Sequence, residues 1–342
     1  MPFKYVKPVR ARAASGLLAD VYRQIRSEFG FLAEPFTLHS PDPELLAAVW
    51  SLEREAVICG EVPRPAKEAV ASSISAANTC PFCAEAHAVL TESAGDRQAS
   101  RALLGRSPAM IADPETRAMA EWAAATAARG DRRLSKPPFT PAEAPEMLGT
   151  ALAYHYVNRV VSVLLSARIT PIPMGPLSRA AQKGVALYAR RAARSRPEPG
   201  ASLGALPDAP LPDDLEWAAS APAVAGAAAR AAAQTERAGA EALPDSVRDL
   251  VTTRVGEWDG SPPPMGRSWL EDAIDPLPAE DLPAARLALL TALASYRVDE
   301  SVVSDFRLAG PSDKQLVGAV AWAAFTAARG VTGWATSAQA PA

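Results

Sequence analysis

The sequence predicts an all-α protein, and three observations support this fold class. Long segments are rich in Ala, Leu, Val, Glu and Arg, most of which favour helices. Proline interrupts these segments at intervals, and the period-two alternation typical of strands is hard to find. The chain has 342 residues, too many for one ordinary core, so we expect two domains or one duplicated unit.

Composition and charge exclude several classes of protein. The net charge is −3 and acidic and basic residues are mixed along the chain, so we expect no nucleic-acid partner. No run of about 18 uninterrupted apolar residues occurs, so we expect no membrane span. Residues 1–12 are basic, but no apolar stretch of signal-peptide length follows them. Because only three cysteines are present, a reducing compartment is favoured, and we expect a cytoplasmic protein.

Two helices are predicted ahead of the cysteine-containing segment. Asp42, Pro43 and Glu44 are typical of a helix start, as N-cap, first residue and first-turn acid. The apolar stripe that follows ends at Gly60 and comprises Leu45, Val49, Leu52, Ala56 and Cys59. A second helix begins at Pro65. One of its faces carries Glu68, Ser72, Ser75 and Ala76, whose small members would let a neighbouring helix come close.

Three more helices are predicted in the first half. One begins at Pro81, which makes Cys80 its N-cap, and the next runs from Asp113 and Pro114 to Gly130. The last spans about residues 142–167 and carries a polar and aromatic group, Tyr154, His155, Tyr156, Asn158 and Arg159. We expect the aromatic members of this group to be core residues, with a pocket wall as the alternative.

The composition changes near the middle of the chain. Residues 190–213 contain an arginine-rich run followed by five prolines, which cannot form one continuous helix. We interpret this stretch as a connection between a first domain at 1–189 and a second domain at 214–342. The basic run is more typical of a solvated helix end than of a phosphate-binding patch.

The second half repeats the first faintly but in the same order. An offset of 181 residues, falling to about 169 downstream, pairs Pro63 with Pro244, Pro81 with Pro262, Gly149 with Gly318 and Tyr156 with Phe325. The same alignment places Ser261, Pro264 and Ser268 opposite Cys80, Cys83 and His87. The sequence therefore predicts a second half that keeps the scaffold and lacks the thiols.

The residues that carry chemistry lie in one short segment, Cys80-Pro-Phe-Cys83, with His87 four residues further on. A helix N-terminus favours the thiolate form of cysteine, whose pKa is otherwise about 8.5. Cys83 and His87 share one helix face, so the imidazole is placed to act as a base for the thiol. Glu68, on the preceding helix, is placed to orient His87 in a carboxylate–imidazole–thiol relay. We predict that Cys83, Cys80, His87 and Glu68 are catalytic, with no cofactor and no metal.

Two alternatives to a catalytic dithiol remain. The cysteines can be inert core residues, although the histidine in register makes this the weaker interpretation. The segment can also bind zinc, with Glu68, Cys59 or His155 as fourth ligand, but no second Cys/His pair typical of structural zinc sites is visible. Cys59 itself lies on an apolar stripe and is expected to be a buried small residue.

The segment from Glu68 through Cys80-Pro-Phe-Cys83-Ala-Glu-Ala-His87 resembles the AhpD-like alkyl hydroperoxidases of the carboxymuconolactone decarboxylase superfamily. The family signature is a glutamate twelve residues before a Cys-x-x-Cys and a histidine four residues after it, and these spacings hold here. The resemblance is sharp over residues 60–95 and diffuse to about 168. It implies an all-α, AhpD-like helical bundle, here as two tandem copies of which the second is degenerate.

The resemblance implies a thiol peroxidase that reduces organic hydroperoxides or hydrogen peroxide. Cys83 would attack the peroxide and Cys80 would resolve the sulfenic acid, with Glu68 and His87 as the proton relay. A dithiol such as a protein-bound lipoyl group would regenerate the enzyme. Helix-cap geometry alone favours Cys80 as the attacking sulfur, so an exchange of the two roles stays open. Family members assemble as oligomers, and we expect a homo-oligomer.

One residue departs from the pattern of some family members. These carry a histidine just before the second cysteine, where this chain has Phe82. The departure leaves the rate and the electron donor open. Two rival functions are a decarboxylase of the same superfamily acting on a lactone acid, and a zinc-stabilised or redox-sensing interaction module without turnover.

Overall fold

The computed structural model describes residues 3–166 and 197–338. The described residues form helices joined by turns, with one isolated β-bridge between Phe3 and Leu165, and the predicted all-α class is confirmed. The arginine-rich run at 190–196 and the end of the first predicted domain lie outside the described residues. The division at residues 189 and 214 therefore remains a prediction.

The first half contains eight described α-helices, and three of their connections include a short 3₁₀ or π-helical turn. They are α1 (Gly16–Glu28), α2 (Glu34–Thr37), α3 (Pro43–Glu53), α4 (Arg64–Ala77), α5 (Pro81–Ala94), α6 (Arg97–Leu104), α7 (Pro114–Ala125) and α8 (Ala144–Leu164). The second half has six among the described residues: α10 (Pro222–Ala242), α11 (Asp245–Glu257), α12 (Ser268–Ile274), α13 (Leu282–Ala294), α14 (Glu300–Arg307) and α15 (Asp313–Ser337).

The predicted helix starts are confirmed by their caps. The carboxylate of Asp42 accepts from the backbone N–H of Leu45 at 3.1 Å, and Asp113 caps α7 in the same way. Cys80 is the N-cap of α5, as expected from Pro81.

Two helix ends differ from the prediction. α3 ends at Glu53 and a π-helical turn, η2 (Arg54–Ile58), continues the chain toward Gly60. α7 ends at Ala125, before Gly130. There the loop packs against the second half, and the backbone N–H of Arg129 donates to the carbonyl of Asp259 at 2.8 Å. The long-range bond takes the place of further helical turns.

The internal repeat is visible in the order of the helices. The two offsets place α3, α4, α7 and α8 opposite α10, α11, α13 and α15. Gly149 and Gly318, which the offset pairs, share a role: a Cβ at Gly149 would lie 2.8 Å from the Cβ of Ala56, and one at Gly318 would lie 2.8 Å from the carbonyl oxygen of Ala238. Each glycine therefore allows one helix to cross its neighbour closely.

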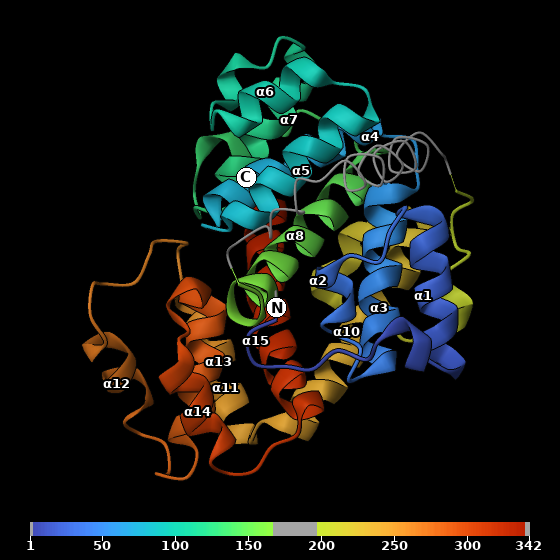
Figure 1. The fold of residues 1–342 in the computed structure, drawn as a ribbon. Coiled ribbons are helices and arrows are strands. Elements are labelled where there is room, and N and C mark those ends of the chain that lie inside the picture. The colour runs from blue at the N-terminus through green and yellow to red at the C-terminus, as the bar shows by residue number, and fades with distance from the viewer. Residues whose placement is uncertain (1–2, 167–196, 339–342) are drawn as a thin grey trace, which may run out of the picture.

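The two halves pack together through equivalent elements. α8 and α15 run through the centre of the molecule, and α3 lies beside α10 (Figure 1). Tyr156 and Phe325, paired by the offset, contact each other with ring centroids 5.8 Å apart. Contact between equivalent residues is expected where a pseudo-two-fold axis passes between two copies. One hydrophobic core contains residues of both halves.

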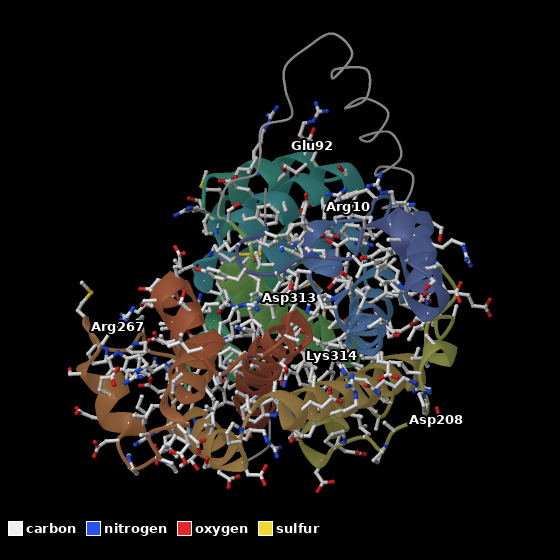
Figure 2. All side chains as sticks on the ribbon, turned by 60° about the horizontal axis from the view of Figure 1, so that its bottom comes forward. Arg10, Glu92, Asp208, Arg267, Asp313 and Lys314 are labelled. Atoms are coloured by element: carbon white, nitrogen blue, oxygen red, sulfur yellow. A yellow bond between two sulfur atoms is a disulfide. The ribbon has the colours of Figure 1, made fainter. Side chains whose placement is uncertain are left out.

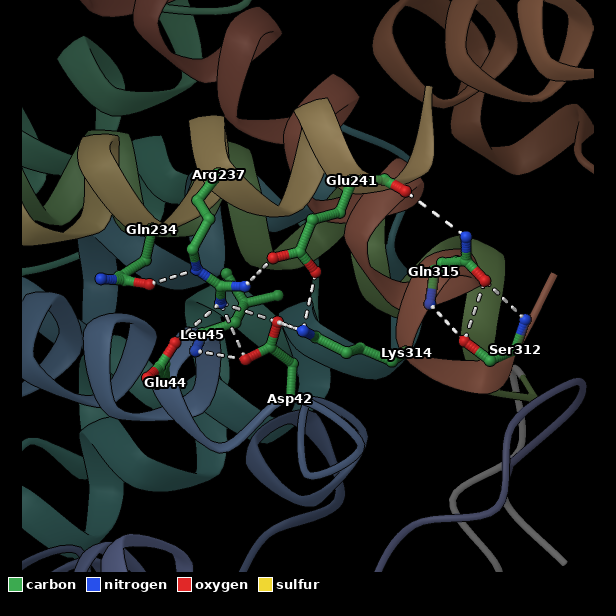
Figure 3. A network of polar contacts seen from close by, with 9 residues as sticks. All are labelled: Asp42, Glu44, Leu45, Gln234, Arg237, Glu241, Ser312, Lys314 and Gln315. Carbon is green, nitrogen blue, oxygen red and sulfur yellow. Dashed lines mark hydrogen bonds and ion pairs between the residues drawn. The ribbon is translucent and has the colours of Figure 1, made fainter. Parts of the chain in front are cut away.

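An ion-pair network links the same elements at the surface (Figure 3). Arg237 on α10 donates to both carboxylate oxygens of Asp42, at 2.8 and 3.0 Å, and to Glu241 at 2.7 Å. Lys314 at the start of α15 contacts Glu241 at 2.7 Å and lies 3.9 Å from Asp42. The cap of α3 is thus tied to two helices of the second half.

The longest apolar helix belongs to the core. α15 is long and apolar enough to cross a membrane by length and composition, but 78% of its most apolar window is buried inside the protein. A core helix of a soluble protein shows this burial. Acidic and basic side chains both extend from the surface, among them Asp208 and Arg267 (Figure 2).

Candidate active site

The close approach of α4 and α5 creates the site. The hydroxyl of Ser72 on α4 donates to the carbonyl of Ala84 on α5 at 2.9 Å, so the small side chain lets the two backbones come together as predicted. One turn before Ser72 on α4 lies Glu68, and one turn after Ala84 on α5 lies His87. The two side chains therefore meet in the space between the helices.

Glu68 and His87 form a buried hydrogen bond. Nδ1 of His87 lies 2.7 Å from Oε2 of Glu68, whose residue is only 1% exposed. Nε of Arg64, one turn earlier on α4, donates to Oε1 of Glu68 at 2.5 Å. Each oxygen of the carboxylate has its own partner, so the group is held in one orientation.

The electrostatics of this triad decide which nitrogen of His87 is basic. Burial raises the pKa of Glu68, but the positive charge of Arg64 and the hydrogen bond from His87 outweigh it and lower the pKa to about 2. Glu68 is therefore ionised at neutral pH, and Nδ1 of His87 carries the proton that it donates to the carboxylate. Nε2 is left with its lone pair, and it makes no hydrogen bond to any other described residue. The arrangement leaves Nε2 as the nitrogen that can take a proton from a thiol.

Cys80 and Cys83 are linked by a disulfide, with their Cα atoms 5.5 Å apart. Cys80 caps α5 and Cys83 lies in its first turn, one turn before His87. Both cysteines are 2% exposed. The four residues that the sequence singles out thus lie on two packed helices as two contacting pairs, Cys80 with Cys83 and Glu68 with His87.

The sequence did not identify a second carboxylate near His87, that of Glu53. The ring of Tyr154 on α8 meets the His87 ring edge-on, with centroids 4.4 Å apart, and its hydroxyl donates to Oε1 of Glu53. Burial raises the pKa of Glu53, although the hydrogen bond from Tyr154 opposes it. Oε2 of Glu53 has no hydrogen-bond partner among the described residues. No spacing in the sequence relates Glu53 or Tyr154 to the dithiol, whereas Arg64 is detectable as an i,i+4 partner of Glu68.

The aromatic and polar group on α8 is buried, as expected for core residues. His155 receives a hydrogen bond from the amide of Asn78 at 3.1 Å on Nδ1, and Nε2 lies 2.8 Å from the hydroxyl of Thr126. Burial and then the charge of Arg159 hold the pKa of His155 well below its usual range, so the imidazole is neutral. The hydroxyl of Tyr156 lies 2.7 Å from Nε2 of His39, a buried residue in the turn before α3.

Of the three residues considered as a fourth zinc ligand, Glu68 and His155 have other partners and Cys59 is a free thiol. Cys59 is a buried free thiol, and burial raises its pKa to about 12. Glu68 and His155 are both bonded to protein groups as described above. Over residues 3–166 and 197–338, no group of three His, Cys, Asp or Glu side chains is arranged to hold a metal ion. These observations count against the zinc alternative.

Comparison with known proteins gives one extensive similarity. The chain is 39% identical over 332 residues to the alkyl hydroperoxide reductase Rv2159c of Mycobacterium tuberculosis. The alignment covers 96% of this chain and 94% of that protein, so it includes the dithiol segment and the thiol-free half alike. No family model matches the sequence. No solved structure matches it either.

Proposed function

The chain belongs to the AhpD-like alkyl hydroperoxidase family, and on this premise we propose that it reduces hydroperoxides through a Cys80–Cys83 dithiol/disulfide cycle. The observation that carries the proposal is the buried hydrogen bond between Glu68 on α4 and His87 on α5, the helix that also carries the disulfide. A relay of this kind has a use when a thiol must be deprotonated. It has no evident use for a purely structural disulfide.

The first step uses Cys83 of the reduced enzyme. Nε2 of His87 takes the proton of the Cys83 thiol, and the charge of the resulting imidazolium is balanced by ionised Glu68. The thiolate attacks the terminal oxygen of the hydroperoxide, so an S–O bond forms and the O–O bond breaks. The leaving alkoxide takes the proton back from His87 and departs as an alcohol. Cys83 is then a sulfenic acid, oxidised by two electrons, and the peroxide is reduced by two.

The second step forms the disulfide. The sulfur of Cys80 attacks the sulfenic sulfur of Cys83, the S–O bond breaks and water leaves. In the disulfide that results, the Cα atoms are 5.5 Å apart, within the usual range. An external dithiol then reduces the bond by exchange and is itself converted to a disulfide.

Burial of the sulfurs bears on the electron donor. Both cysteines are 2% exposed. A thiol on the flat surface of a reductant protein therefore cannot reach either sulfur directly. A slender dithiol on a flexible arm can approach with small side-chain movements. We therefore favour a lipoyl-type donor, and we expect dihydrolipoamide to support turnover better than a thioredoxin.

Steady-state peroxidase assays test the proposal. Wild type, Cys80→Ser, Cys83→Ser and Cys59→Ser are compared with cumene hydroperoxide as substrate and dihydrolipoamide as donor. We expect both dithiol variants to lose turnover and the Cys59 variant to keep it, because that thiol is buried and apart from the relay. Equal activity in wild type and the Cys83 variant would refute the proposal.

A further inference from the structure

A cavity of about 80 Å³ lies where the two halves of the chain meet, beside the dithiol segment. From the first half it is lined by residues 77–79, immediately before Cys80, by Ala127 and by Arg159 of α8. The second half contributes residues 293–296 and the loop around Trp258. The repeat places this loop opposite residues 77–81, so the cavity lies between two equivalent segments of which only one carries thiols.

The loop that contains Gly260 in the second half lies in close contact with the first half. Gly260 has φ +91°, and a Cβ there would lie 2.0 Å from the carbonyl oxygen of Ala127. A side chain is therefore excluded at this position. The bond from Arg129 to Asp259 holds the same loop against the first half.

Arg159 is a buried cation without a counter-ion. It is 5% exposed, and no carboxylate of the described residues lies within 4 Å of its guanidinium. Nε donates to the carbonyl of Ala292 at 2.9 Å and Nη1 to that of His155 at 2.6 Å. Nη2 has no hydrogen-bond partner in the described part of the chain. Burial alone lowers the pKa of Arg159 to about 10, so the group stays charged at neutral pH.

The other walls of the cavity fit an anion with an apolar tail. The guanidinium carbon of Arg159 lies 5.7 Å from the centre of the Trp258 ring, which covers one face of the charge. Ser295 is buried, and its hydroxyl has no partner among the described residues. Leu293 and Ala294 add apolar surface, while Thr79 and Tyr296 are exposed at the edge.

We propose that this cavity binds a carboxylate group, and that it is the subsite for the acid end of a carboxylic-acid hydroperoxide. A cavity of about 80 Å³ has room for a small polar group such as a carboxylate. An anion would complete the hydrogen bonding of Nη2 and of Ser295 and would neutralise a charge that is costly to bury alone. Thr79 lines the cavity and directly precedes Cys80 in the chain, and we place the peroxide end of the substrate on this side, toward the dithiol. The assignment to substrate rests on the proposed function, whereas carboxylate binding itself does not.

The first experiment measures binding without turnover. Acetate is titrated into wild type, Arg159→Gln, Arg159→Lys, Ser295→Ala and the exposed-residue control Arg101→Gln, with calorimetry and tryptophan fluorescence as readouts. We expect saturable binding that weakens about tenfold or more in Arg159→Gln and less in Arg159→Lys, since lysine keeps the charge. Trp258→Phe should lose the fluorescence change and keep the calorimetric signal.

Circular dichroism checks that each variant is folded. If the arginine variants do not fold, the acetate affinity of Ser295→Ala tests the site instead. No saturable acetate binding, or equal binding in wild type and Arg159→Gln, would overturn the proposed site.

The second experiment identifies the source of the carboxylate. ω-Hydroperoxy acids of increasing chain length are compared with their methyl esters, and kcat/KM is measured for each pair. A substrate subsite predicts an acid-to-ester ratio above one at an optimum length, which falls about tenfold in Arg159→Gln. If acetate binds through Arg159 but the ratio is one at every length, the substrate assignment is wrong. If no peroxide turns over while acetate still binds, the proposed function fails and the site stands.

Discussion

Glu68 accepts a hydrogen bond from Nδ1 of His87 at 2.7 Å, and both side chains are buried between α4 and α5. The bond fixes the tautomer of the histidine and directs Nε2 away from the carboxylate. Because Arg64 keeps Glu68 ionised, the imidazolium formed during proton transfer is stabilised by a fixed negative charge. This relationship leads to the first two predictions.

Replacing Glu68 with glutamine should slow peroxide reduction. The amide keeps the size of the side chain but removes the negative charge that would balance the imidazolium during proton transfer, and it no longer fixes the tautomer of His87. We expect kcat/KM for cumene hydroperoxide to fall about 10- to 100-fold, the range seen when an outer partner of a functional histidine is removed. Glu85→Gln, an exposed glutamate on the same helix as His87, is the control and should retain wild-type activity.

Replacing Arg64 with methionine should move the acid limb of the pH–rate profile. Without the guanidinium, burial dominates and the pKa of Glu68 rises from about 2. In the variant the Glu68 carboxylate is therefore protonated at a higher pH than in wild type. Once protonated, it no longer stabilises the imidazolium of His87. We expect the acid limb to shift upward while activity at alkaline pH changes less. An unchanged acid limb would mean that Arg64 does not maintain the charge of Glu68. Arg97→Met, at an exposed position on α6, is the control for the loss of one positive charge.

Glu53→Gln should stabilise the protein at neutral pH. Burial raises the pKa of Glu53 above its ordinary value of 4.5, so the folded state holds the proton more tightly than the unfolded state. The stability of wild type then declines as the pH rises above about 4.5, whereas that of the variant lacks this decline. Glutamine can still accept the bond from Tyr154. Thermal melts should show the variant melting about 1–3 °C above wild type at pH 7.5 and with little difference at pH 4.

The thiol of Cys59 should be inert in the native state. Burial raises its pKa to about 12, so almost no thiolate is present at neutral pH. After oxidation to the Cys80–Cys83 disulfide, native protein should take up no iodoacetamide, and denatured protein should take up one equivalent. Uptake of one equivalent by the native oxidised protein would show that Cys59 is accessible.

Two glycines of α15 should respond in opposite ways to alanine. A Cβ at Gly318 would lie 2.8 Å from the carbonyl oxygen of Ala238, so Gly318→Ala must separate α15 from α10. We expect a loss of about 1–3 kcal/mol in the free energy of unfolding, as for other overpacked contacts. A Cβ at Gly333 meets nothing within 4 Å, so Gly333→Ala should stabilise by about 0.5–1 kcal/mol. Urea denaturation measures both.

Much of the fold follows from local signals in the sequence. The starts of α3 and α7 are set by a capping aspartate and a following proline, and that of α5 by Pro81, all of which act within a few residues. The helix ends were harder to predict. The end of α7 depends on a bond to Asp259, more than a hundred residues away, and the π-helical turn after α3 has no strong local signal.

The same distinction applies to the site. Cys80, Cys83, His87 and Glu68 lie within twenty residues on two adjacent helices, so helical spacing alone brings them near one another. Glu53 and Tyr154 reach the same place from α3 and α8, which only the tertiary packing determines. The Arg159 cavity needs both halves of the chain. The sequence identified the arginine as part of a polar group, but it contained no signal for Trp258 or Ser295 as neighbours.

A single-turnover experiment tests the central claim, that Cys83 is oxidised by peroxide and resolved by Cys80. Reduced protein is mixed with one equivalent of cumene hydroperoxide, and the products are mapped by mass spectrometry in wild type, Cys80→Ser and Cys83→Ser, with a sulfenic-acid trap present. We predict a rapid Cys80–Cys83 disulfide in wild type and trapped sulfenic acid on Cys83 in Cys80→Ser. Sulfenic acid on Cys80 in Cys83→Ser, with none on Cys83, would exchange the two roles. If both thiols of wild type stay reduced over minutes, the peroxidase account is wrong.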